Sequence, residues 1–109
     1  MYLFNNTLFI NLEHCKDRLE HASREFKKMN IDAERVDAIK HNVGAIGCSM
    51  SHIKCLEIAK KRNYEYVFIC EDDIEFKNPT LLSANLQKFC NNDKLNWDIL
   101  IIGGNNAPP

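Results

Sequence analysis

The sequence predicts an α/β protein, a three-layer sandwich with a mainly parallel sheet. Short apolar runs alternate along the chain with longer segments whose apolar residues recur at spacings of three and four, so strands alternate with helices. The run at residues 66–70 has no polar alternation, which is typical of a strand that is covered on both faces. A helix between successive strands favours parallel pairing through right-handed crossovers.

The first strand and the first helix are predicted near the amino terminus. Residues 8–12 form an apolar strand, and residues 16–29 form an amphipathic helix that Asn30 ends. The apolar face of that helix contains Leu19, Ala22, Phe26 and Met29. Residues 35–39 are the second predicted strand.

A second helix is predicted after residues 44–47, and it reaches approximately to residue 62. Two apolar stripes run along it, so we expect it to be central and packed on more than one side. One stripe contains Ile46, Met50, Ile53 and Leu56, and the other contains Cys48, His52, Cys55 and Ala59.

The remaining strands and the third helix are predicted from the last part of the chain. The strand at residues 66–70 stops at three consecutive carboxylates, and Asn78 with Pro79 is a favourable start for a helix. That helix would turn Leu82, Leu86 and Phe89 inward. Residues 97–102 are the fourth predicted strand, and a Gly103-Gly104 turn follows them.

Composition narrows the class of protein. The 109 residues suit one ordinary globular domain, and 14 basic residues are interspersed with 15 acidic ones, which disfavours nucleic acid as a partner. No apolar run is long enough to span a bilayer and no signal peptide is evident, so we expect a cytoplasmic protein. The odd number of cysteines, without framework-like spacing, predicts reduced thiols.

The acidic cluster Glu71-Asp72-Asp73 is the main candidate site. Ligands of open α/β sheets gather beyond the carboxyl ends of the strands, which is where these acids lie. If the chain stays extended, Glu71 and Asp73 point the same way and Asp72 points the opposite way. Adjacent carboxylates repel one another, and a bound hard divalent cation such as Mn²⁺ or Mg²⁺ is the simplest way to neutralise this repulsion. The alternative is a solvated turn before the third helix.

Several short segments, in order along nearly the whole chain, carry a family resemblance. They are Ile10-Asn11-Leu12 with Asp17-Arg18, residues 31–39, Gly44-Ala45-Ile46-Gly47-Cys48 with Ser51-His52, Glu71-Asp72-Asp73, and Trp97-Asp98-Ile99-Leu100 with Gly103-Gly104. With these segments the chain resembles glycosyltransferase family 25, the galactosyltransferases of lipooligosaccharide and lipopolysaccharide biosynthesis, which share features with the procollagen galactosyltransferases.

The resemblance implies a GT-A type nucleotide-diphospho-sugar transferase fold and a metal-dependent glycosyltransferase. It also implies a UDP-sugar donor, with UDP-galactose favoured, a saccharide or protein acceptor, and a divalent metal that is usually manganese. In this interpretation Asp73 is a direct metal ligand and Glu71 binds metal or ribose. Asp72, which is counted with the donor-binding residues, is tied to the backbone or to side chains behind the direct ligands. Metal would neutralise the leaving diphosphate.

Four further residues are candidates for donor binding. Asn11 lies at the end of the first strand, where its amide could bind uracil or ribose, and Arg18 could reach a phosphate from the following helix. Ser51 and His52 are placed in the first turns of the second helix, where backbone N–H groups favour an anion. The alternative for Asn11 and Arg18 is a turn residue and a surface cation. No catalytic residue is assigned.

The chain also departs from the family pattern. It has His14 where an arginine is usual and Lys40-His41 where an Asp-Gly pair is usual. The resemblance implies that residues 1–109 are the amino-terminal, donor-binding part, without the acceptor half that supplies the catalytic base. Enzymatic activity of the chain is therefore left open, and the alternative function is an inactive donor-binding or partner-binding module. Such a part is expected to self-associate or to bind a second chain.

A thiol-metal protein is a third function class. Spacings of four and three place Cys48, His52 and Cys55 on one helical face, where they could hold zinc. A fourth ligand would come from Cys15, His14 or Cys70. The alternative is that these residues are ordinary core residues.

Overall fold

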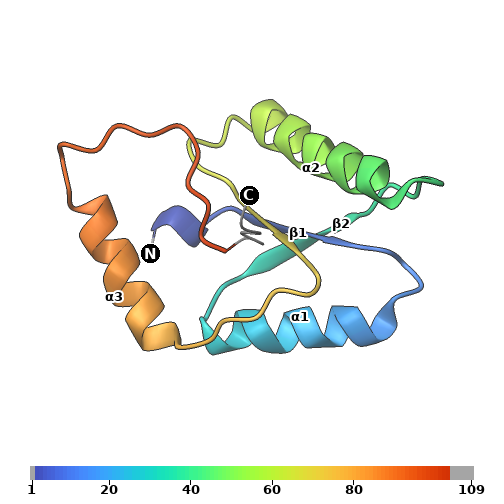
Figure 1. The fold of residues 1–109 in the computed structure, drawn as a ribbon, viewed down its shortest axis with the longest axis horizontal. Helices are drawn as coiled ribbons and strands as arrows, with labels where there is room; N and C mark the ends of the chain where they lie inside the picture. Colours follow the sequence, from blue (N-terminus) through green and yellow to red (C-terminus); the bar gives the residue numbers. More distant parts are fainter. Residues whose placement is uncertain (1, 104–109) are drawn as a thin grey trace, which may run out of the picture. The chain divides into compact units, whose positions relative to one another are not determined.

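The computed structural model describes residues 2–103 and divides the chain into two compact units, Met1–Pro79 and Thr80–Pro109. Each unit is described separately. The first unit contains, in chain order, the 3-10 helix η1 (Tyr2–Phe4), β1 (Thr7–Asn11), α1 (Lys16–Lys28), β2 (Ala33–Asp37), α2 (Gly44–Lys61) and β3 (Phe68–Glu71) (Figure 1).

The three strands of the first unit form one parallel sheet in the order β2-β1-β3. The central strand β1 pairs with β2 from Thr7 opposite Ala33 to Asn11 opposite Asp37. On its other side β1 pairs with β3, and Ile10 lies opposite Glu71. All five residues of β1 are buried, so this strand is the centre of the unit.

The two faces of β1 pack against different helices. The ring of Phe9 lies 5.2 Å from the ring of Phe26 on α1, centroid to centroid. Leu8 and Ile10 point to the other face and form a core cluster with Cys55 of α2. In Figure 1 the sheet accordingly runs between α1 and α2. The predicted α/β class with a parallel sheet is confirmed, and helices cover both faces of the sheet.

Both helices of this unit end at an asparagine with positive φ. Asn30 has φ 53° and Asn63 has φ 57°, which is the left-handed conformation that commonly stops a helix. The backbone N–H of Ile31 then donates to the carbonyl of Phe26, and that of Tyr64 donates to the carbonyl of Ala59. The predicted end of the first helix at Asn30 is confirmed.

Several predicted boundaries in this unit are shifted. The first strand is Thr7–Asn11 rather than residues 8–12, and the third is Phe68–Glu71 rather than residues 66–70. The second strand is Ala33–Asp37 rather than residues 35–39, because the chain leaves the sheet after Asp37 and the N–H of Ile39 donates to Ser51 Oγ instead. The second helix already begins at Gly44, so the glycine segment belongs to it.

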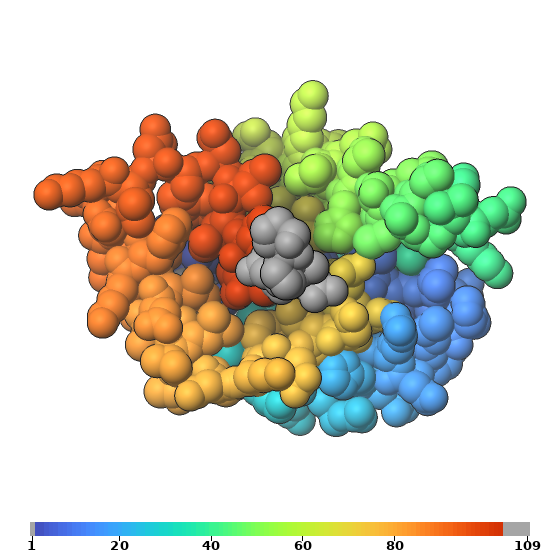
Figure 2. Space-filling view, in the orientation of Figure 1, coloured from blue at the N-terminus to red at the C-terminus, as the bar shows by residue number. Residues whose placement is uncertain are grey.

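The expectation that α2 is packed on more than one side is wrong. Its buried residues are Gly47, Ser51, Cys55 and Ala59, which lie on one face. The other stripe is exposed to between 41% and 54%, over Ile46, Met50, Ile53 and Leu56. Figure 2 shows side chains of α2, in green, projecting from the surface of this unit.

The second unit contains α3 (Pro79–Cys90), which confirms the third predicted helix. Leu86 is buried, and the ring of Phe89 lies 5.5 Å from the ring of Trp97. The fourth predicted strand is wrong: residues 97–102 form no strand among those the structure describes, and the sheet of residues 2–103 has three strands. Ile99 and Ile101 are 83% and 77% exposed, so this apolar run has no strand neighbour that would bury it.

No helix within residues 2–103 is both long enough and apolar enough to cross a membrane. The five cysteines are free thiols. The Gly103-Gly104 turn of the sequence lies partly outside the described residues.

Candidate functional site

The carboxyl edge of the sheet contains a point where the strand order reverses. The chain passes from β1 to β2 on one side and then crosses β1 to form β3 on the other side. In open α/β sheets the crevice at such a switch point is the usual place for a ligand. Here β1 ends at Asn11 and β3 ends at Glu71, so the predicted site residues lie at this edge.

Asp72 links the two strand ends from inside the protein. It is only 6% exposed, and its Oδ2 accepts a hydrogen bond of 2.9 Å from Asn11 Nδ2. Its Oδ1 accepts a hydrogen bond of 3.2 Å from Arg18 on α1. The Asp72 carboxylate is therefore hydrogen-bonded within the protein. Through these bonds it holds the side chains of Asn11 and Arg18, two residues predicted to bind the sugar donor, in place.

Arg35 of β2 extends this network and was missed by the sequence reasoning. Its Nε donates to Asn11 Oδ1 at 2.9 Å, and its second amino group donates to the Asn11 carbonyl at 3.0 Å. It also forms an ion pair with Asp37 at 2.6 Å. In the sequence, only its position in a short strand, two residues before Asp37, could have drawn attention to Arg35. The parallel register of β1 and β2 is needed to show that Arg35 lies near Asn11.

Glu71 and Asp73 are exposed, whereas Asp72 between them is buried. The strand ends at Glu71, and a turn follows in which the N–H of Ile74 donates to the Glu71 carbonyl. Both acids affect the Cys48 thiol. Its pKa is raised by the hydrogen bond to Glu71, by burial, and by the charges of Glu71 and Asp73. The two exposed carboxylates thus share one region of the surface.

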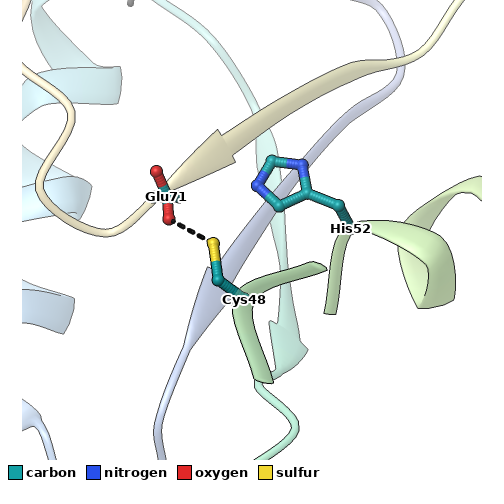
Figure 3. A group of neighbouring side chains, drawn as sticks. All are labelled: Cys48, His52 and Glu71. Atoms are coloured by element: carbon teal, nitrogen blue, oxygen red, sulfur yellow. Dashed lines mark hydrogen bonds between the residues drawn. The ribbon is translucent and has the colours of Figure 1, made fainter. Parts of the chain in front are cut away.

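Cys48 and His52 of α2 face the end of β3. Cys48 Sγ donates a hydrogen bond of 3.0 Å to Glu71 Oε1. The ligand-forming atoms of Cys48, His52 and Glu71 all lie within 4.8 Å of one another, and Figure 3 shows the three side chains converging from the helix and the strand end. The structure therefore replaces Cys55 by Glu71 in the predicted thiol-metal set.

Cys55 and the candidate fourth ligand Cys70 lie inside the core instead. Cys55 is fully buried among Leu8 and Ile10, and burial raises its pKa. Burial likewise raises the pKa of Cys70 to about 12. Both side chains are neutral thiols that fill core space.

The comparisons with known proteins identify the family. The model of glycosyltransferase family 25, described as LPS biosynthesis protein, matches residues 41–103. This chain belongs to glycosyltransferase family 25. The matched residues include Cys48, Ser51, His52 and the acidic cluster.

Two curated relatives extend the comparison. The chain is 27% identical to a protein named procollagen galactosyltransferase 1-B, from Xenopus laevis, over 92% of this chain and 21% of the relative. It is 34% identical to a protein named "Putative glycosyltransferase", from Haemophilus influenzae, over 70% of this chain and 25% of the relative. The chain therefore spans about a fifth to a quarter of the length of these relatives.

Of the predicted donor-binding residues Ser51 and His52, only His52 is partly accessible. Ser51 is 1% exposed, its Oγ donates to the Gly47 carbonyl, and the same oxygen accepts from the N–H of Ile39, both at 2.8 Å. Since α2 begins at Gly44, both residues lie about two turns inside the helix, beyond the backbone N–H groups that could bind an anion. Ser51 instead joins α2 to the segment after β2.

A shallow hollow of about 250 Å³ lies beside this edge, where β1 passes into α1. It is lined by His14, Cys15, Lys16, Asp17 and Arg18. The Arg18 side chain is 62% exposed while it pairs with Asp72. Arg18 thus links this hollow to the buried acid that lies between Glu71 and Asp73 in the sequence.

The segment after the acidic cluster is fastened to α1. Glu25 is 6% exposed, and its carboxylate accepts a hydrogen bond of 2.8 Å from the N–H of Phe76 and pairs with Lys28 at 2.7 Å. His21 Nε2 donates to the carbonyl of Ile74 at 2.7 Å. The hydrogen bonds from Lys28 and from the Phe76 N–H lower the pKa of Glu25. This fastening fixes the chain directly after Asp73.

Proposed function

We propose that this chain forms the donor-binding part of a glycosyltransferase with a GT-A type fold, which binds a UDP-sugar together with Mn²⁺ or Mg²⁺. The observation that carries the proposal is the pair of exposed carboxylates, Glu71 and Asp73, at the switch point of the sheet. Family membership agrees with it.

In this proposal Asp73 is the direct metal ligand and Glu71 binds the metal or the ribose. Both are exposed carboxylates, and hard divalent cations prefer oxygen ligands. When bound, the metal neutralises negative charge on the diphosphate. Asp72 contributes indirectly, because its carboxylate is already occupied by Asn11 and Arg18.

The residues around the hollow would contact the nucleotide. Arg18 has five N–H donors and uses one nitrogen on Asp72, so its exposed guanidinium can also bind a phosphate oxygen. Asn11 is 1% exposed, so its proposed role is to hold the strand end against which the uridine lies. His52 is proposed to contact the donor from α2, and Ser51 to keep α2 in place for it.

The sugar and the acceptor are proposed from the relatives. A relative named procollagen galactosyltransferase favours UDP-galactose as the donor, and the description of the family model favours a lipopolysaccharide acceptor. The catalytic base is not assigned to any residue of this chain.

The experiment is a thermal unfolding scan of the purified chain with UDP alone, Mn²⁺ alone and both together. The proposal expects a larger rise in melting temperature with both ligands than the sum of the separate rises, because metal and diphosphate complete each other's coordination. Asp73→Asn should abolish the joint rise. Asp32→Asn is the matched control, because Asp32 is also exposed but precedes β2, at the opposite edge of the sheet.

Release of UDP from UDP-galactose separates the two functional alternatives. Mn²⁺-dependent release by the 109-residue chain means that it is catalytic, whereas joint stabilisation without release means that it is a donor-binding module. An absence of joint stabilisation contradicts the proposed function in both forms.

A further inference from the structure

We propose that Cys48, His52 and Glu71 form a binding site for Zn²⁺ or another thiophilic divalent cation, distinct from the proposed site for Mn²⁺. The inference goes beyond the proposed function, because it requires no nucleotide. Glu71 belongs to both sites, and His52 is also proposed to contact the donor. Cys48 belongs only to the zinc site and Asp73 only to the Mn²⁺ site, so variants of these two residues test each site without the other.

The geometry of the three side chains is close to that of a zinc site. Cys48 and His52 are four residues apart on α2 and therefore project from the same face of the helix. Their ligand atoms and a Glu71 oxygen lie within 4.8 Å of one another, and the Sγ–Oε1 distance is 3.0 Å. Tetrahedral zinc with normal bond lengths holds such ligand atoms roughly 3.4–3.6 Å apart. Small side-chain rotations are sufficient to reach this geometry.

The elements that present the three ligands are fixed by buried contacts. Ser51, between Cys48 and His52, is buried and joins α2 to Ile39 through its hydroxyl. Glu71 is the last residue of β3 and lies opposite Ile10 in the sheet. A cation therefore finds a largely pre-arranged set of ligands, and little conformational entropy is lost when it binds.

The identity of the ligands selects the class of metal. A thiolate and an imidazole are soft or borderline ligands that favour zinc and similar transition metals over Mn²⁺ and Mg²⁺. Cys48 and Glu71 are exposed and His52 is half-buried, so a cation can enter from solvent. Three protein ligands leave one tetrahedral position for water or for another molecule, as in catalytic zinc sites.

Binding also has a defined proton balance. In the metal-free protein the Cys48 thiol keeps its proton and donates a hydrogen bond to the Glu71 carboxylate. The metal binds the thiolate, so the S–H proton is released to solvent, and the Glu71 oxygen that accepted the hydrogen bond becomes a ligand. Cys48 therefore releases one proton for each cation bound.

The test uses Co²⁺ as a spectroscopic substitute for zinc in metal-free protein. The proposal expects a thiolate-to-cobalt charge-transfer band that saturates at one Co²⁺ per chain and disappears when Zn²⁺ is added. Cys48→Ser should remove the band. His52→Ala and Glu71→Gln should each weaken the Co²⁺ affinity by more than about 100-fold, since even the loss of an outer-shell partner costs roughly 10–100-fold.

A matched control comes from a residue of the same type outside the cluster. Cys90→Ser in α3 should leave the band and the affinity unchanged. Cys48 is exposed, so Cys48→Ser should fold normally, and a circular dichroism spectrum equal to that of the wild type verifies this. The absence of a band in the wild type, or a band that survives in Cys48→Ser, overturns the proposal.

Asp73→Asn distinguishes this proposal from the proposed function. Asp73 is not among the three ligands, so this variant should keep the cobalt band while it loses the joint stabilisation by UDP and Mn²⁺. A chain with the band but without joint stabilisation supports only the zinc site, and the reverse result supports only the donor site.

Discussion

The side-chain amide of Asn11 donates a 2.9 Å hydrogen bond to the buried carboxylate of Asp72, 61 residues further along the chain. This bond joins the carboxyl ends of β1 and β3 at the switch point of the sheet. It separates the roles of the three consecutive acids, because Asp72 is used inside the protein while Glu71 and Asp73 stay exposed. One acid of the cluster is therefore structural, and its neighbours are available for a ligand.

Asp72→Ala is expected to lower the free energy of unfolding by about 1–3 kcal/mol, because it removes one of the two acceptors of the buried Asn11 amide group and leaves only the Cys15 carbonyl. Asp73→Ala is the control: an exposed residue away from such contacts should change the free energy by no more than about 0.5 kcal/mol. Urea unfolding measures both. Equal effects of the two variants would mean that the Asn11–Asp72 bond contributes nothing to stability.

Gly47→Ala is expected to destabilise the protein by about 1–3 kcal/mol, because an added methyl group must be accommodated by backbone movement. A Cβ there would lie 2.8 Å from the Ile39 carbonyl oxygen and 3.2 Å from the His41 nitrogen. Gly44→Ala in the same helix has no atom within 4 Å of the new Cβ and should leave stability equal or raise it by up to about 1 kcal/mol. If Gly47→Ala is as stable as Gly44→Ala in urea, the close approach of α2 to residues 39–41 is wrong.

Glu25 should make stability sensitive to acid. Its pKa is lowered in the folded protein by the hydrogen bonds from Lys28 and the Phe76 N–H, so its contribution is present above the unfolded pKa of about 4.3 and is lost as pH falls through the folded value. Glu25→Gln should therefore lose less stability than the wild type between about pH 7 and about pH 3. Urea midpoints at the two pH values measure the difference.

Wild type and Glu25→Gln must be compared because Glu34 also makes the folded protein less stable as the pH falls. Arg62 lowers the pKa of Glu34 through a hydrogen bond, and this pair is present in both the wild type and Glu25→Gln. If the stability of the wild type and of Glu25→Gln depends on pH in the same way, Glu25 does not contribute to the acid sensitivity.

The Cys48 thiol should react slowly despite its exposure. The hydrogen bond to Glu71 is the main cause of its raised pKa, so less thiolate is present at neutral pH than in an ordinary cysteine. Glu71→Gln removes the negative acceptor and should speed alkylation of Cys48 by iodoacetamide, as read by mass spectrometry of the Cys48 peptide. The Cys90 peptide is the internal reference. An unchanged Cys48 rate in Glu71→Gln would contradict the 3.0 Å contact.

The sequence was sufficient to predict the elements that carry strong local signals. The helical spacing of Leu19, Ala22 and Phe26 predicted α1, and the asparagine after it predicted the helix end. The apolar run before Glu71 predicted β3 and the location of the acids. Each of these signals depends on residues that are neighbours in the chain, so no tertiary information was needed.

The errors arose where a tertiary contact decides the outcome. Residues 97–102 have the composition of a strand, but a strand also needs a paired neighbour, and composition does not specify one. The stripe that begins at Ile46 has helical spacing but lies on the exposed face of α2, because Gly47 and Ser51 on the opposite face pack against the segment after β2. The contacts of Arg35 with Asn11, and of Cys48 with Glu71, follow from strand register and helix placement, which periodicity leaves open.

The most direct test of the central claim is a titration of Mn²⁺ with protein, in the presence and absence of UDP. The concentration of free Mn²⁺ is read from its electron paramagnetic resonance signal. If Glu71 and Asp73 hold a cation that binds a nucleotide diphosphate, UDP should tighten Mn²⁺ binding, and Mn²⁺ should tighten UDP binding by the same factor. Asp73→Asn should bind neither ligand cooperatively. Two results would contradict the claim: a free Mn²⁺ signal with protein and UDP together that is fully explained by separate binding of Mn²⁺ to protein and to UDP, or cooperative binding that survives in Asp73→Asn.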